Sequence, residues 1–319
     1  NDNWALLKAQ NIALNHRAPL IVCFHYYGTY KDANIRQYKF LLDGLRETQQ
    51  RLNELQIHFY LIRGRCHIEL PKFIEKHRVG HLVTDFSPLK VYKRRLKKVI
   101  NRISIPITQV DTHNIIPVWE ASDKKEFSAY TIRSKIKKLL PDYLLEIPKI
   151  KKHLIVIKTK KHEIAWNKIT DSLNVNIEIK PLDWINPGEK SAMKLLEKLK
   201  TSLEGYHNSR NDPTINKLSN LSPYFHYGHI SPQRVALEII KSELQPEDKK
   251  AFLEEMIVRR ELADNFCHYE KDYDFFEGFH VWAQKTLNEH RNDEREYIYP
   301  DEQFEAGETH DLLWNAAQN

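Results

Sequence analysis

The chain has 319 residues, of which 41% are hydrophobic and 29% charged, and its formal net charge is +6. This length allows two ordinary domains or one large one, with a sizeable core. No run approaches the roughly 20 apolar residues that span a bilayer, and the first ten residues resemble neither a signal nor a transit peptide. The cysteines, Cys23, Cys66 and Cys267, have no CxxC spacing. We therefore expect a reducing compartment and neither a metal site nor a disulfide framework.

Residues 1–120 alternate between strand and helix patterns. Trp4 to about His16 is amphipathic, and further helical patterns cover 35–56, 68–78 and 90–102. Apolar runs at 19–27, 58–64, 81–87 and near 106–117 predict strands between these helices. Near-continuous apolar strands that alternate with helices predict a parallel sheet covered on both faces, an α/β fold. No G-x-G-x-x-G follows a strand, so the usual dinucleotide fingerprint is absent.

The rest of the chain has a different character. Residues 121–190 are polar, rich in lysine and punctuated by proline, which predicts a long interdomain linker. Residues 191–319 have helical periodicity without strand alternation, with helices expected at 192–206, 231–244, 249–269 and 280–292. The sequence thus predicts an α/β half, a linker and an all-α half.

Basic residues are concentrated in particular segments. Residues 90–102 carry seven basic groups and no acid, and six lysines lie between Lys149 and Lys161. By contrast, residues 289–311 carry nine acids and two arginines. The basic segments fit a phosphate-bearing partner. For any one of them, a solvated helix face or loop is the plainer interpretation.

Residues 217–234, KLSNLSPYFHYGHISPQR, contain small polar residues ahead of a proline. Ser219, Asn220 and Ser222 precede Pro223, which is typical of a turn or a helix start with unpaired backbone N–H groups. Such groups can bind an anion, including a phosphate. On these residues alone, an ordinary capped helix is the plainer interpretation.

Several blocks, in this order and spacing, resemble the DNA photolyases. They are NDNWALL at the N-terminus, YHNSR at 206–210, the stretch 217–234, FLEEMIVRRELADNFCHY at 252–269 and IYPDEQFEAGETHDLLWNAAQ at 298–318. RRELADNF and THDLLWNAAQ are most similar to the class II cyclobutane pyrimidine dimer photolyases. The resemblance covers the whole chain. It implies an antenna domain around a parallel sheet, a linker and a helical domain that binds FAD.

The resemblance also implies a reaction. Reduced, light-excited flavin donates an electron to a cyclobutane pyrimidine dimer in DNA, the dimer splits, and the electron returns. Damaged DNA is therefore the expected partner. We expect a monomeric lyase that does not associate with a membrane. Its expected location is the cytoplasm, near the nucleoid, or the nucleus in a eukaryote. An antenna chromophore, a deazaflavin or a folate, is left open.

The resemblance implies roles for single residues at the cofactor. The loop 218–222 would hold the FAD diphosphate, Tyr206 would contact the flavin cofactor, and Asn265 would lie near the flavin. Trp314 matches the flavin-proximal tryptophan of an electron relay. The implied cofactor-binding residues are Tyr206, Leu218, Ser219, Asn220, Leu221, Ser222 and Asn265. Taken alone, Tyr206 and Trp314 would more simply be core residues.

Further residues are implied at the lesion. Arg210 would reach a DNA phosphate, and Glu255 would hydrogen-bond the dimer carbonyls, which gain negative charge when the electron arrives. That role requires a protonated acid, whose pKa burial would raise. Glu254 is the neighbouring alternative. Arg259 and Arg260 are the other implied DNA contacts.

For two of these residues the sequence leaves a choice. Glu255 is favoured over Glu254 by its spacing to Arg260 and Glu261. Arg259 equally fits an ion pair with Glu255, Glu261 or Asp264.

This chain departs from the family at both ends. The family's sequence continues beyond the last residue, and its first strand precedes NDNWALL, so we expect a shortened or partial chain. Loss of that central strand would expose apolar sheet edges. Two alternatives stay open: a cryptochrome-type FAD photoreceptor without repair activity, and a non-catalytic DNA-binding remnant. Arg210 and Glu255 favour repair, because a sensor has no need of lesion contacts.

Overall fold

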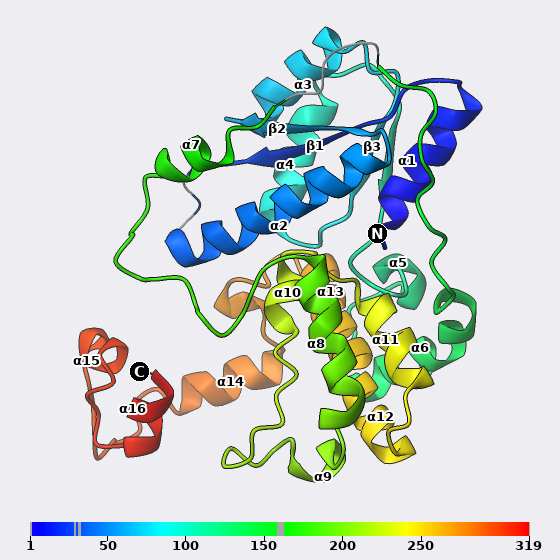
Figure 1. Cartoon of the computed structure of the whole chain (residues 1–319). Helices are drawn as coiled ribbons and strands as arrows, with labels where there is room; N and C mark the ends of the chain where they lie inside the picture. Colours follow the sequence, from blue (N-terminus) through cyan, green and yellow to red (C-terminus); the bar gives the residue numbers. More distant parts are fainter. Residues whose placement is uncertain (1, 29, 31–32, 158–162, 319) are drawn as a thin grey trace. The chain divides into compact units, whose positions relative to one another are not determined.

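A computed structural model describes residues 2–28, 30, 33–157 and 163–318. The chain forms two compact units, Asn1–Glu270 and Lys271–Asn319. The first contains an α/β part and a helical part, and the second contains short helices (Figure 1). Among the described residues, no helix combines the length and the apolar character of a membrane span.

The α/β part alternates helices and strands as the sequence predicted (Figure 1). Its elements are α1 (Trp4–Asn15), β1 (Ile21–Tyr26), α2 (Ile35–Glu54), β2 (His58–Arg63), α3 (Cys66–Lys76), β3 (Leu82–Asp85), α4 (Lys90–Ile100) and β4 (Ile107–Val110). Local caps set two of the starts. The Asn3 side chain accepts from the Leu6 N–H at α1, and Asn34 and Gln37 form a capping box at α2.

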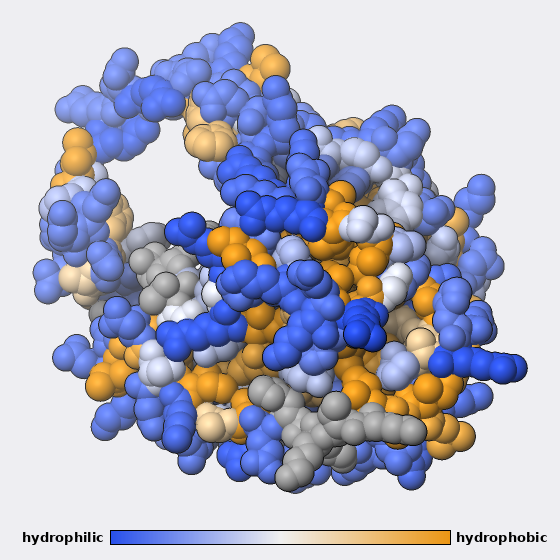
Figure 2. Space-filling model, turned by 90° about the horizontal axis from the view of Figure 1, so that it is seen from above, coloured by the Kyte–Doolittle hydropathy of each residue, from blue (hydrophilic) through white to orange (hydrophobic). Residues whose placement is uncertain are grey.

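The strands pair in parallel, but they form two separate two-stranded sheets. β1 pairs with β2 and β3 pairs with β4, and among the described residues no strand joins the two pairs. A cavity of about 1070 Å³ lies where they would meet, lined by residues of β1, β3, α1 and α2. Among the described residues, β1 and β3 each pair with one strand only. Viewed from the α/β side, apolar side chains are visible among charged ones (Figure 2).

The remaining elements of the first unit are helices. They are α5 (Val118–Ala121), α6 (Ala129–Tyr143), α7 (Trp166–Asp171), α8 (Glu189–Ser202), α9 (Tyr206–Ser209), α10 (Ser222–His226), α11 (Pro232–Lys241), α12 (Pro246–Leu253), the π-helix η1 (Glu254–Arg259) and α13 (Arg260–Tyr269). Of these, α7 packs on α2 of the α/β part. From residue 191 onward, the predicted helical character is confirmed.

Helix α6 lies inside the segment 121–190, where the sequence predicted a linker. Its Ile132 and Ile136 are four residues apart, share one face and are almost fully buried in the helical core. The lysines between and after them occupy the other positions, and this composition hid the amphipathic pattern. Part of the expected linker is therefore core, and the boundary between compact units lies after Glu270.

The α/β and helical parts meet closely at Gly44 of α2. A Cβ on Gly44 would lie 2.1 Å from His229 Nε2, so only glycine leaves room for this imidazole. The ring of Phe40, one helical turn earlier, stacks on His229 with centroids 4.9 Å apart. The Gly188 N–H donates to His229 Nδ1 at 3.1 Å. His229 therefore contacts both α2 and the residue that precedes α8.

The second unit consists of a 3₁₀ turn and helices, which are η2 (Phe276–Gly278), α14 (Val281–Glu289), α15 (Asp301–Glu305) and α16 (Leu312–Gln318). Within it, the Trp314 ring meets the Phe304 ring edge-on, with centroids 5.5 Å apart. Trp314 is 46% exposed in this unit.

Candidate cofactor and lesion site

A buried carboxylate sets the position of α9. Gly205 precedes the helix with φ 75°, in the left-handed region that glycine adopts without steric cost. Asp248 accepts from the N–H groups of Gly205 and His207, at 2.8 and 2.9 Å, and bonds to His207 Nδ1 at 2.7 Å. These contacts fix the short helix, which carries Tyr206 and leads into Arg210.

The long helix predicted for 249–269 contains a π-helical turn. α12, η1 and α13 follow one another without a break, and η1 covers Glu254–Arg259. A π turn inserts an extra residue into a helix and is frequent at functional sites. Here it carries both of the glutamates between which the sequence left a choice.

Glu255 lies at the centre of a small charged cluster. The Arg210 guanidinium pairs with its Oε1, and Arg259 Nε lies 3.1 Å from the same oxygen. Tyr206 lies one helical turn before Arg210, whose N–H donates to the Tyr206 carbonyl at 3.0 Å. Burial first and then the Glu255 charge raise the pKa of Tyr206. The structure thus brings Tyr206, Arg210, Glu255 and Arg259 together.

Two expectations about this cluster can be compared with the structure. The Glu255 side chain is 36% exposed and faces two guanidinium groups, so the burial expected to keep it protonated is absent. For Arg259, the ion-pair alternative is confirmed, with Glu255 as the partner. The roles of Arg210 and Glu255 at a lesion stay predictions.

Glu254 points to a different part of the structure. Arg133 of α6 holds it through Nε at 3.0 Å and through a second nitrogen at 2.7 Å. The hydrogen bond from Arg133 lowers the pKa of Glu254. Of the two glutamates, Glu255 is therefore the one placed beside Tyr206 and Arg210, as the sequence register required.

The loop 218–222 leads into a helix, as the sequence predicted. Leu221 is fully buried and anchors the loop, Asn220 has φ 54°, and α10 begins at Ser222. Among the described residues, no side chain caps the start of α10. Leu218 is 74% exposed, so the segment lies at the surface. Binding of a diphosphate by this loop stays a prediction.

Arg260 and Glu261 form a buried polar pair that the sequence analysis did not identify. Arg260 Nε donates to the Met256 carbonyl, but both terminal nitrogens are buried without a hydrogen-bond partner among the described residues. Glu261 Oε1 accepts from the N–H groups of Ile115 and Ile116, and Oε2 is likewise unpartnered within the described part. Burial raises the pKa of Glu261 to about 7.

The expected contact of Arg260 with DNA stays a prediction, and the burial of its terminal nitrogens does not favour it. A guanidinium whose outer nitrogens are inaccessible does not reach a DNA phosphate without rearrangement. Buried donors without partners are costly, so they favour an acceptor group beside them. The sequence signal was only the doubled arginine at 259–260, which does not show which one faces solvent.

Asn265 has a structural role. Its Oδ1 accepts from the Glu126 N–H at 2.8 Å and its Nδ2 donates to the Lys124 carbonyl at 3.0 Å. The side chain is fully buried and ties α13 to the loop before α6. With both ends of the amide engaged, the expected position near a flavin has no support in these contacts.

Comparisons with known proteins show which family this chain resembles. A sequence model of the DNA photolyase family matches residues 1–152. The chain is 43% identical over 321 residues to a deoxyribodipyrimidine photo-lyase from Potorous tridactylus, covering 99% of this chain and 60% of that protein. It is 36% identical to a deoxyribodipyrimidine photo-lyase from Methanothermobacter thermautotrophicus, covering 99% of this chain and 69% of that protein.

A solved structure shows the same fold. A bacterial class III photolyase from Agrobacterium tumefaciens superposes with a TM-score of 0.71 at 18% identity, over 99% of this chain and 65% of that one. The fold is therefore the photolyase fold, an α/β part followed by a helical part. The chain belongs to the DNA photolyase family. It spans 60% of the length of the relative from Potorous tridactylus.

Proposed function

We propose that this chain carries part of the cofactor- and lesion-binding surface of a deoxyribodipyrimidine photo-lyase, which uses light to split cyclobutane pyrimidine dimers in DNA. One observation carries the proposal: Glu255 and Arg259 on a π turn form a surface cluster with Arg210, which follows Tyr206 at the end of α9. The identity to relatives with that name supports it.

Membership of the family implies FAD as the cofactor in general. The residues present fit such a group. The hydroxyls of Ser219 and Ser222 and the backbone at the start of α10 offer donors of the kind that a diphosphate requires. Arg260 supplies buried N–H groups that have no hydrogen-bond acceptor within the described part of the chain. When bound, FAD supplies the light-excited electron. An antenna chromophore and class II membership stay predictions from the sequence.

The cluster can receive DNA without losing its own ion pairs. Arg210 and Arg259 together carry two positive charges against the one negative charge of Glu255. A guanidinium has five N–H donors, so each arginine can hold Glu255 with one edge and a phosphate with another. The cluster therefore presents a net positive surface, and Glu255 stays oriented within it.

The test is repair by the purified protein supplied with FAD. Under illumination with DNA that contains pyrimidine dimers, we expect restoration of intact pyrimidines and a lower yield of repair in Glu255→Ala. Glu254→Gln is the matched control, because its partner is Arg133 rather than Arg210. Flavin absorbance without repair would favour a photoreceptor. Absence of flavin binding would favour a DNA-binding remnant, and either result contradicts the proposal.

A further inference from the structure

His207, on the short helix α9, pairs with a buried carboxylate on one side only. Its Nδ1 bonds to Asp248 Oδ1 at 2.7 Å. The Asp248 side chain is 1% exposed, whereas the imidazole of His207 is 37% exposed. Within the described part of the chain, no group hydrogen-bonds to the other ring nitrogen, Nε2. One nitrogen of this histidine is therefore fixed, and the other is available at the surface.

The fold places His207 beside Arg210. Arg210 follows α9 with helical dihedral angles, φ −60° and ψ −24°, so the two side chains, three positions apart, share one face. Their partners, Asp248 and Glu255, are seven positions apart, about two turns along the continuous helix formed by α12 and η1. Helix α9 packs on α12, and the two pairs of side chains join it to the long helix at neighbouring positions.

Asp248 determines which nitrogen of His207 carries the proton. Burial alone would raise the pKa of Asp248, but hydrogen bonds from His207 and Gly205 outweigh it, so this pKa is lowered and the carboxylate is ionised in neutral solution. An ionised carboxylate only accepts hydrogen bonds, so Nδ1 must donate to it. In the neutral imidazole, Nε2 then has a lone pair and cannot donate to a phosphate oxygen. Only the imidazolium offers both an N–H at Nε2 and a positive charge.

The net charge of this surface depends on His207. When the imidazole is neutral, the carboxylates of Asp248 and Glu255 together balance the guanidinium groups of Arg210 and Arg259. When the imidazole is protonated, it balances Asp248, and one positive charge remains over the others. The remaining charged groups of α12, of η1 and of the segments that flank α9 cancel in sum; they are Glu204, Asp212, Lys217, Glu247, Lys249, Lys250 and the pair of Glu254 with Arg133.

We propose that His207 is a proton-dependent contact for a DNA phosphate beside Arg210, which it binds as an imidazolium and releases when Nε2 loses its proton. The inference rests on the proposed function, because it requires DNA on this surface. Arg210 has a permanent charge, whereas histidine is the side chain whose charge changes between about pH 5 and 8. Binding of DNA should therefore tighten, and depend more steeply on salt, as the pH falls.

The experiment is a titration of the whole chain with a labelled duplex that contains a pyrimidine dimer, followed by fluorescence anisotropy at several salt concentrations, at about pH 5.5 and about pH 8. In the wild type, the slope of log K against log salt should be steeper at the lower pH by up to about one unit. His207→Asn should remove this difference and weaken binding about fivefold at the lower pH and less than about twofold at the higher pH. Its amide can still donate to Asp248, so α9 keeps that anchor.

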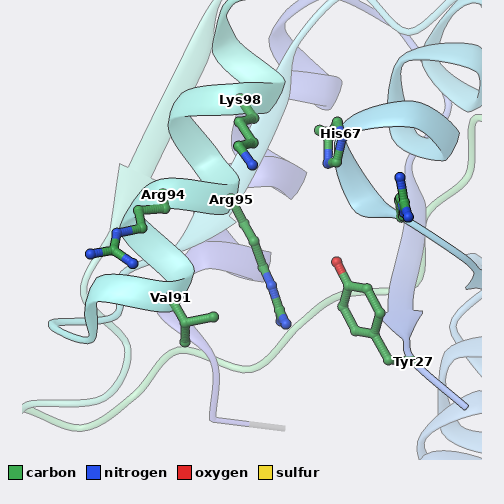
Figure 3. Close-up of a pocket in the computed structure, with 7 residues that line it drawn as sticks. Tyr27, His67, Val91, Arg94, Arg95 and Lys98 are labelled. Atoms are coloured by element: carbon green, nitrogen blue, oxygen red, sulfur yellow. The ribbon is translucent and has the colours of Figure 1, made fainter. Parts of the chain in front are cut away.

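Two further variants complete the test. His207→Arg supplies a permanent cation, so the steeper slope should be present at both pH values. His67→Gln is the matched control. His67 is another partly exposed histidine, but it lies near Lys98 of the basic helix α4 (Figure 3), and within the described residues no carboxylate pairs with it. Slight desolvation and then the charges of Arg102, Lys98 and Arg65 lower its pKa. This variant should keep the pH difference of the wild type.

The outcomes separate this inference from the proposed function. A pH difference that is lost in His207→Asn, kept in His67→Gln and absent in His207→Arg because the slope is steep throughout supports the inference. If His207→Asn keeps the difference, the inference is wrong while the proposed function stands. If His67→Gln removes the difference to the same extent, the effect comes from overall charge, and the inference is again wrong. No binding of the damaged duplex by the wild type at either pH would overturn both.

Discussion

Arg210 and Glu255 lie 45 positions apart in the sequence, and their ion pair joins α9 to the π-helix η1. Arg259 approaches the same carboxylate oxygen from further along η1. Two cations thus share one anion at the surface, which leaves a net positive charge there. An arrangement of this kind holds its arginines in a defined position while their other donors remain able to meet a phosphate.

The first prediction concerns DNA binding. Arg210→Ala should weaken binding to damaged DNA and reduce the salt dependence of log K by up to about one unit, because one phosphate contact is lost. Binding measured at a series of salt concentrations gives this slope. Arg133→Ala is the control, since Arg133 is engaged by Glu254 on another face. An unchanged slope would show that Arg210 makes no phosphate contact.

The second prediction concerns photochemistry in the flavin-loaded protein. Glu255→Ala should lower the quantum yield of repair while flavin absorbance stays nearly intact, because Glu255 orients Arg210 and Arg259, whose N–H groups can donate to the dimer after charge appears there. Losing one oriented donor to a developing oxyanion costs on the order of 3 kcal/mol in other enzymes, and the effect here should be smaller because light drives the reaction. DNA binding should not weaken, since the substitution removes a negative charge.

Glu254→Ala is the control for this prediction. It breaks the pair with Arg133, so it should lower stability and leave the yield unchanged. If Glu254→Ala lowers the yield and Glu255→Ala does not, the alignment with the family is displaced by one residue. If neither changes the yield, the hydrogen-bonding role does not apply to this chain.

The sequence predicted those parts of the structure that depend on local pattern. The periodicity of residues 35–56 predicted α2, and the alternation of strands and helices predicted the parallel pairing. What it missed depends on partners far along the chain. The buried state of Glu261 depends on backbone N–H groups 146 and 145 positions away, at Ile115 and Ile116. No local spacing carries that information.

In the candidate site, too, local sequence pattern predicted some features, while others depend on the three-dimensional structure. The resemblance of the sequence blocks to a known family was enough to assign Tyr206, Arg210 and Glu255 to one site, and the structure places them close together. The different environments of Arg259 and Arg260 depend on the π turn, which changes the angle between successive side chains and is not visible as a pattern in EEMIVRR. The lysines of α6 had a similar effect, because they masked the face formed by Ile132 and Ile136.

The third prediction concerns the contact between the two parts of the first unit. Gly44→Ala should lower the free energy of unfolding by about 1–2 kcal/mol. Overpacking costs about 1–3 kcal/mol, and the added Cβ would lie 2.1 Å from His229 Nε2. The better helix propensity of alanine returns at most about 1 kcal/mol. Urea unfolding measures the difference. Gly80→Ala is the control, because nothing lies within 4 Å of its added Cβ, and equal losses would refute the steric account.

The fourth prediction concerns His229 and pH. Burial lowers its pKa from 6.5 to about 4, so the unfolded chain binds more protons than the folded chain between these values. This group therefore stabilises the fold above about pH 6.5, and the contribution, on the order of 3 kcal/mol, is lost as the pH falls to about 4. Urea unfolding at several pH values should show this loss. His229→Gln should abolish it, whereas the exposed His226→Gln should not.

The last prediction combines His229 with Glu261, whose titration has the opposite sign. Burial raises the pKa of Glu261 from 4.5 to about 7, so the folded chain binds more protons than the unfolded chain in this range. Its contribution is present below about pH 4.5 and is lost as the pH rises to about 7. The two slopes oppose each other between about pH 4.5 and 6.5, and the stability of the wild type should therefore vary little there.

Each single substitution should reveal the slope of the other residue. In His229→Gln, unfolding free energy should fall as the pH rises from 4.5 to 7, because Glu261 is left uncompensated. In Glu261→Gln, whose amide oxygen can still accept from the Ile115 N–H, it should rise with pH because His229 remains. In the double variant, the free energy of unfolding should again vary little with pH, and it should be lower than in the wild type. If Glu261→Gln has the same pH profile as the wild type, Glu261 does not titrate in this window and its neighbour Arg260 keeps it ionised.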